Sequence, residues 1–164
     1  MRKMTHKKGF TLIELLIVIT IMGILAALIS TNLYGARERA LDSQKKSNLD
    51  QLKTALHSYY ANYRKFPAST NGMTIYGCGT NGTSQCADSF TAGNVEYLNK
   101  FAKSGSFYAF RYYSCNNGDD FRLKINLTNG SDQEILESQA NCPANACIGQ
   151  SLSYGSTDYV LCGN

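Results

Sequence analysis

The sequence predicts an α+β protein in which one long N-terminal helix packs against a small antiparallel sheet, giving a ladle shape. Residues 10–29 are almost uninterruptedly apolar, and a helical period of apolar residues continues from there to about residue 64. Apolar and polar residues alternate at 121–127, which is typical of a strand. At 164 residues the chain can form one domain with a hydrophobic core, and it is short for two.

The apolar segment at 10–29 predicts a transmembrane helix, since twenty residues span about 30 Å. It is longer than the apolar region of an ordinary secretory signal, and no A-x-A cleavage triplet follows it. We therefore expect this segment to remain in the mature protein. Four basic residues precede it, which predicts a single pass through the cytoplasmic membrane with the N-terminus on the cytoplasmic side. They are Arg2, Lys3, Lys7 and Lys8, and without them the chain holds twelve basic and twelve acidic residues.

Helical periodicity beyond the apolar segment predicts an amphipathic continuation that ends before Pro67. Apolar residues recur at mostly three- and four-residue intervals, and charged residues occupy the other face. The apolar stripe is Leu33, Ala36, Ala40, Leu41, Leu49, Leu52, Ala55, Leu56, Tyr59 and Tyr63. The charged face is Arg37, Glu38, Arg39, Asp42, Lys45, Lys46, Asp50 and Lys53.

The rest of the chain predicts a small sheet reached through a long loop. Residues 67–94 lack an apolar period and predict a connecting loop, and a short helix is expected at 95–103. The strand-like runs at 108–115 and 121–127 flank Asn116-Asn-Gly-Asp-Asp120, so they predict an antiparallel hairpin, and 158–162 predicts a last strand. We expect four segments: a basic leader at 1–9, a transmembrane and assembly half-helix at 10–30, an amphipathic half-helix at 31–65, and a globular head at 66–164 with its cysteine-rich C-terminal region.

Six cysteines lie between residues 78 and 162, and an even number in an exported region predicts disulfides. Zinc is the competing interpretation, but there is no C-x-x-C pair and no histidine beyond His57, so we expect no metal. The sequence does not choose among the fifteen connectivities, although Cys78 with Cys86 would close a short loop. The candidates are Cys78, Cys86, Cys115, Cys142, Cys147 and Cys162.

A lone acid, Glu14, stands five residues into the apolar segment, where a carboxylate is costly unless it has a partner. Around it, Lys8-Gly9-Phe10-Thr11-Leu12-Ile13-Glu14 closely resembles the processing signature of type IV prepilins and of the pseudopilins of type II secretion. The resemblance covers residues 7–29. One departure is Thr31, which stands where many members carry proline and puts helix bending or melting there in doubt.

The resemblance implies a pilin fold and cleavage by a prepilin peptidase between Gly9 and Phe10, followed by N-methylation of Phe10. It implies that Glu14 neutralises the N-terminal amine of a neighbouring subunit during assembly. It further implies a homo-oligomeric filament, built with an inner-membrane assembly platform and minor pilins from membrane-embedded subunits. The filament would be an extracellular pilus for adhesion, motility or DNA uptake; the alternative is a periplasmic pseudopilus of type II secretion. Six cysteines favour the exposed pilus.

Other functions find little support in the sequence. The exported region has one histidine, His57, and no hydrolase or nucleotide-binding motif, so we expect neither an enzyme nor a cofactor. Arg111, Tyr113, Arg122 and Lys124 could share an outward face of the hairpin and contact DNA, but a solvated face is favoured because the chain after the leader is neutral. The turn at 116–120 could offer oxygen ligands to calcium, but a turn needs these residues in any case.

Overall fold

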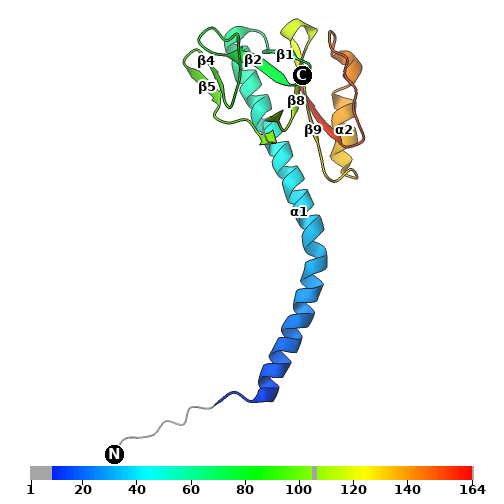
Figure 1. Ribbon diagram of the computed structural model, residues 1–164. Coiled ribbons are helices and arrows are strands. Elements are labelled where there is room, and N and C mark those ends of the chain that lie inside the picture. Colours follow the sequence, from blue (N-terminus) through cyan, green and yellow to red (C-terminus); the bar gives the residue numbers. More distant parts are fainter. Residues whose placement is uncertain (1–8, 105–106, 164) are drawn as a thin grey trace, which may run out of the picture. The chain divides into compact units, whose positions relative to one another are not determined.

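The computed structural model describes residues 9–104 and 107–163, and one helix, α1 (Leu12–Tyr63), confirms the predicted long N-terminal helix (Figure 1). Its backbone is helical through residue 31, whereas the side chains of residues 30–34, Leu33 among them, lie outside the described residues. The helix ends at Tyr63, and the next residue, Arg64, has a φ of 57° and donates its backbone N–H to Tyr60 O at 2.8 Å. A left-handed residue at this place closes the helix C-terminus.

The chain divides into two compact units, an N-terminal unit (Met1–Glu38) and a C-terminal unit (Arg39–Asn164). The C-terminal unit contains the second part of α1 and every strand that the structure describes.

The central sheet of the C-terminal unit is antiparallel and has the order β10-β9-β8. Its strands are β8 (Arg111–Cys115), β9 (Asp120–Asn126) and β10 (Asp158–Cys162). Cys115 pairs with Asp120 across the β8–β9 hairpin, and Asn116 and Asn117 in its turn have φ of 52° and 59°. The predicted hairpin, with a turn of residues that tolerate positive φ, and the predicted last strand are therefore confirmed.

The segment between α1 and β8 differs from the prediction. Residues 67–94 are not a plain loop, and 95–103 is not a helix. The chain forms short strands instead: β1 (Ala68–Thr70), β2 (Thr74–Cys78), β3 (Ser84–Gln85), β4 (Phe90–Ala92), β5 (Val95–Leu98), β6 (Lys103–Ser104) and β7 (Phe107–Tyr108). Strands of two to five residues are too short to show an apolar period, which is why composition alone predicted a loop.

The core of the C-terminal unit forms on one stripe of α1. Five of the predicted stripe residues are buried there against Ile75 of β2, Phe90 of β4 and Phe121 of β9. They are Leu49, Leu52, Ala55, Leu56 and Tyr59. The stripe is not buried at its N-terminal end, since Ala36, Ala40 and Leu41 are exposed.

Strand β9 is covered on both faces, which corrects the prediction of a strand with one solvated face. A helix that the sequence did not predict, α2 (Gln133–Asn141), packs with β10 beside it. As a result Arg122 is buried and pairs with the buried Asp120, while Lys124 Nζ lies 2.9 Å from Asp158 Oδ2. The outward-facing basic surface expected from Arg111, Tyr113, Arg122 and Lys124 does not form.

Helix α2 also protects the outer edge of β10. The buried Ser138 hydroxyl accepts the Val160 backbone N–H at 3.1 Å and donates to Ile135 O at 2.8 Å. The Gln139 side-chain amide donates to Asp158 O at 2.7 Å. Backbone groups on an edge strand otherwise remain available to pair with another chain, so α2 closes this edge with side chains.

Three disulfides join all six cysteines within the C-terminal unit. They are Cys78–Cys86, Cys115–Cys147 and Cys142–Cys162, with sequence separations of 8, 32 and 20 residues. The first closes the β2–β3 region, the second joins the end of β8 to the C-terminal loop, and the third ties the end of α2 to β10. Each removes conformational freedom from the unfolded chain.

Asp42 corrects the prediction of an exposed charged face on α1, because it is only 2% exposed. Its carboxylate accepts the backbone N–H groups of Thr128 (2.8 Å) and Asn129 (2.8 Å), and Lys45 Nζ lies 2.8 Å away. Burial alone would raise the pKa of Asp42, but the hydrogen bonds from Lys45, Asn129 and Thr128 outweigh it and lower the pKa to about 2. Asp42 thus clamps the loop after β9 to α1.

We predict that Asp42 makes the stability of the C-terminal unit depend on pH in the acidic range. Its pKa is lower in the folded chain than the ordinary value of 3.8, so its contribution is complete above about pH 4 and is lost as pH falls towards 2. This contribution is about 2 kcal/mol. Denaturant unfolding of the oxidised protein in detergent can be followed by near-ultraviolet circular dichroism. Between pH 5 and pH 2, the free energy of unfolding should fall less for Asp42→Asn than for the wild type. Equal losses would contradict the prediction.

We also predict that Ser138→Ala lowers the free energy of unfolding by about 1–3 kcal/mol, since it leaves the Val160 N–H buried without a partner. The same denaturant measurement at neutral pH checks this. Ser153→Ala is the matched control, because Ser153 is exposed and its hydroxyl forms no hydrogen bond with any described residue. If both variants unfold at the same denaturant concentration as the wild type, the edge contact is not stabilising.

Candidate assembly site

The start of α1 is built by a capping box between Thr11 and Glu14. Thr11 precedes the first helical residue, and its carbonyl accepts the Leu15 N–H at 3.3 Å. Its hydroxyl oxygen lies 3.4 Å from the Glu14 N–H, while Glu14 Oε2 accepts the Thr11 N–H at 2.9 Å and the Thr11 hydroxyl at 2.7 Å. This reciprocal pattern satisfies N–H groups that have no partner inside the helix.

The capping box gives Glu14 a local structural role that the sequence analysis missed. The Thr-x-x-Glu spacing before an apolar run is the signal that could have shown it. Glu14 Oε1 accepts no hydrogen bond from any residue that the structure describes, so one carboxylate oxygen stays available. Gly9 and Phe10 stand just before the box, outside the helix, and the Phe10 ring is 84% exposed.

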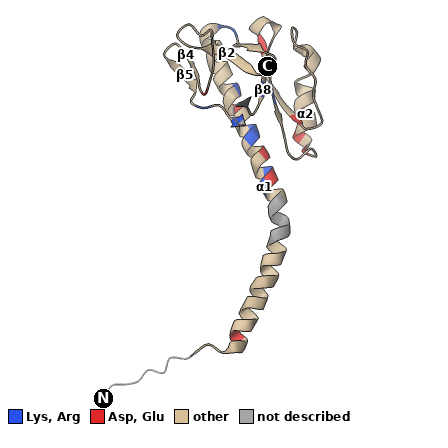
Figure 2. Ribbon diagram, in the orientation of Figure 1, with Lys and Arg blue, Asp and Glu red and all other residues tan. Residues whose placement is uncertain are grey.

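The helix that follows Glu14 is apolar around its whole circumference. Large apolar side chains from Leu12 to Ile29 are all more than 40% exposed, and they occupy every helical face. The hydroxyl of Thr20 is satisfied internally, since it donates to Ile17 O at 2.8 Å. Glu14 is the one charged residue in the sequence between residues 9 and 29, and in Figure 2 this part of the helix is tan beyond a red band near its start.

By length and composition, Leu12–Ile29 can cross a membrane. Its 18 residues extend about 27 Å along the helix axis. Because the apolar surface is complete on all sides and none of it is buried within the chain, it requires an apolar environment from outside.

The remaining residues singled out from the sequence do not gather into a second site. In the β8–β9 turn, Asn116 Oδ1 accepts the Ile148 N–H at 3.0 Å, and Asp120 Oδ1 accepts the backbone N–H groups of Phe121 and Gly163. Their oxygens are therefore used within the fold. His57 lies edge-on to the rings of Phe66 and Phe121, and burial and the charge of Lys53 lower its pKa.

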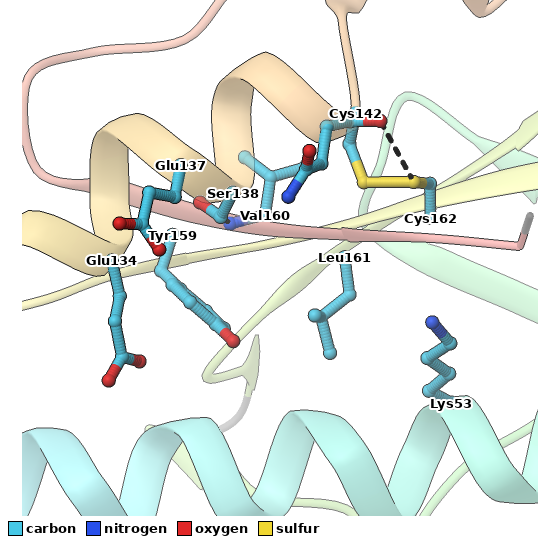
Figure 3. Close-up of a pocket in the computed structure, with 10 residues that line it drawn as sticks. Lys53, Glu134, Glu137, Ser138, Cys142, Tyr159, Val160, Leu161 and Cys162 are labelled. Atoms are coloured by element: carbon cyan, nitrogen blue, oxygen red, sulfur yellow. Dashed lines mark hydrogen bonds between the residues drawn. A yellow bond between two sulfur atoms is a disulfide. The ribbon is translucent and has the colours of Figure 1, made fainter.

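A groove of about 520 Å³ separates α1 from α2 over the β10 strand. Figure 3 shows Lys53 of α1 on one side, Glu134 and Glu137 of α2 on the other, and Tyr159 and Leu161 between them. Glu134 is already held by Lys46, whose Nζ lies 2.8 Å from its Oε2. The groove pairs no nucleophile with a base, so its geometry offers no catalytic arrangement.

Comparison with known proteins identifies the N-terminal segment. Residues 4–30 match the family model described as the prokaryotic N-terminal methylation motif. The matched segment includes Gly9, Phe10 and the capping-box acid. With the relatives below, this match shows that the N-terminal part of the chain is similar to that of pilins and pseudopilins.

The relatives are type II secretion proteins and a type IV pilin. The chain is 36% identical over 73 residues to type II secretion system core protein G of Escherichia coli, covering 44% of this chain and 50% of that protein. It is 34% identical over 73 residues to core protein G of Vibrio cholerae, with the same coverage. It is 41% identical over 66 residues to the type IV major pilin protein PilA of Myxococcus xanthus, covering 40% of this chain and 30% of that protein.

The matched stretches span half or less of the length of these relatives. No solved structure gives a significant match to the chain. The similarity to these proteins, together with the apolar helix, supports anchoring of the chain in a membrane.

Proposed function

We propose that the protein is a structural subunit of a type IV pilus-like filament and assembles through its N-terminal helix. The observation that carries this proposal is a fully exposed apolar helix with one acid, Glu14, at its start. An apolar filament core would bury that surface. A carboxylate and an amine are each costly in such a core and tolerable as a pair, so pairing of Glu14 with the amine of a neighbour's Phe10 would fix the register.

The proposed route begins in the cytoplasmic membrane with the N-terminus inside. A prepilin peptidase cuts between Gly9 and Phe10 and the new terminus is methylated; an assembly platform and minor pilins then insert the subunit into a homo-oligomeric filament. The basic leader supports this orientation, although residues 1–8 lie outside the described residues. Three disulfides support a filament exposed outside the cell.

A pseudopilin of type II secretion is the second candidate, and the similarity to core protein G favours it. Both candidates use the same N-terminal segment. They differ in where the processed protein accumulates.

Intact mass spectrometry of sheared surface filaments and of membranes tests the processing. We expect a chain that begins at methylated Phe10 and gains six mass units on reduction, since three disulfides take up six hydrogens. The processed chain in sheared filaments supports the pilus, whereas its confinement to membranes supports the pseudopilus. An uncut N-terminus in both fractions would refute the proposal.

Two variants separate the capping role of Glu14 from its proposed pairing role. Glu14→Gln keeps a capping box, because glutamine also accepts the Thr11 N–H, but it removes the charge; Glu14→Ala removes both. We predict that both variants insert in the membrane and are processed, and that both lose filaments, as judged by immunoblots of sheared fractions. Wild-type filament levels in Glu14→Gln would assign the role of Glu14 to helix capping alone.

A further inference from the structure

We propose that the exposed face of α2 in one copy docks into a groove at the end of α1 in a second copy. Leu136 enters the groove and Glu137 pairs with Lys65 at its rim. This inference rests on the proposed filament function and specifies one contact between neighbouring subunits.

The projecting surface is the outer face of α2. Leu136 is 75% exposed, and Gln133 and Ala140 share its face at helical spacing; the exposed Glu137, which also lines the α1–α2 groove, borders this face. Glu137 forms no ion pair with any described residue, in contrast to Glu134, which binds Lys46. The face therefore combines an unburied leucine with an acid that has no partner in the described part of the chain.

The receiving surface is a groove of about 340 Å³ between the end of α1, β1 and the β8–β9 turn. Its lining includes the exposed Ala68 and an edge of the 7% exposed Phe66, together with Lys65, Ser69, Asn117 and Gln150. Lys65 is exposed and makes no ion pair with any residue that the structure describes. An apolar patch beside a free ammonium group matches a leucine beside a free carboxylate.

The walls of this groove are fixed by hydrogen bonds and a disulfide. The Phe66 N–H donates to Gly118 O at 2.8 Å, and the Ser114 N–H donates to Ser69 Oγ at 2.8 Å. Gln150 Nε2 donates to Ser114 O at 3.2 Å, and the Cys115–Cys147 disulfide joins the two loops beside it. A preformed groove binds without a large ordering cost.

The two surfaces lie at different levels along α1. Lys46 binds Glu134 at the start of α2, and Lys53 lines a groove with Asn141 at its end, so α2 runs beside residues 46–53 (Figure 1). The helix continues to Tyr63, which places its end about 15–26 Å further along the axis at 1.5 Å per residue. The surfaces are therefore too far apart to meet within one copy.

A contact between two different surfaces of identical chains is heterologous, and it propagates into an open filament unless the rotation closes a ring. Both halves of the contact are present on this chain, and their charges are complementary. A second copy is therefore the occupant that the surfaces fit.

Photo-crosslinking tests the contact directly. With a photoreactive phenylalanine analogue in place of Leu136, irradiated filaments should yield dimers in which position 136 is joined to the peptide containing residues 65–69. The same analogue in place of Val95, a 46% exposed residue of β5, is the control and should not label that peptide. Dimers joined through other peptides, or no dimers in intact filaments, would overturn the proposal.

Charge reversal gives a second test. Lys65→Glu and Glu137→Lys should each lower the filament yield about fivefold, corresponding to a loss of about 1 kcal/mol, and the double variant should restore it. Lys100→Glu and Glu96→Lys are matched controls at exposed positions outside both surfaces. The test requires each variant to be processed at Phe10 and fully oxidised, as intact mass shows. Wild-type yield from both single variants would overturn this contact and leave the proposed function standing, whereas absence of filaments from the wild type would refute the function itself.

Discussion

The apolar stripe from Leu49 to Tyr59 along α1 is the surface on which the C-terminal unit closes its core. Strands from both three-stranded sheets reach it, with Ile75 from β2 and Phe121 from β9. Sheets this small have too little apolar area to exclude water from a face by themselves. The same helix is apolar on all sides before residue 30 and needs an external environment there. One helix thus has a segment that needs an external apolar environment and a segment that forms part of the core of the C-terminal unit.

Because the second face of β9 is covered, charged side chains are buried in the interior. They are paired there with side chains of opposite charge. Arg122 is held by Asp120 and by Phe121 O at 2.8 Å, although its Nε finds no partner among the described residues. Such a buried pair costs desolvation and is weak evidence for stability, but loss of either partner alone would leave an uncompensated charge. The Cys142–Cys162 disulfide and α2, which cover this face, hold the pair in register.

The sequence predicted the elements whose signals are local and repeated. The long helix, the β8–β9 hairpin and β10 each span enough residues to show a period or a turn signature. The strands before β8 are too short for that, and α2 has only Ile135 and Ser138 buried, so its apolar face is minimal. Asp42 looked like any solvated charge because its partners, the N–H groups of Thr128 and Asn129, are more than eighty residues away. The processing segment was recognisable from its motif, whereas the disulfide pairing depends on the folded geometry.

The capping box lowers the free-energy cost of placing the Glu14 carboxylate in an apolar environment. In the single chain, Oε2 already receives two hydrogen bonds from Thr11, so the carboxylate is partly satisfied before any neighbour arrives. Its second oxygen receives none from the described residues and can accept an ammonium group without breaking the box. In the proposed filament, a neighbour's amine would add to the local bonds without competing with them, and a charge-assisted bond is stronger than a neutral one in low dielectric. Helix initiation and subunit pairing can then use the same side chain at the same time.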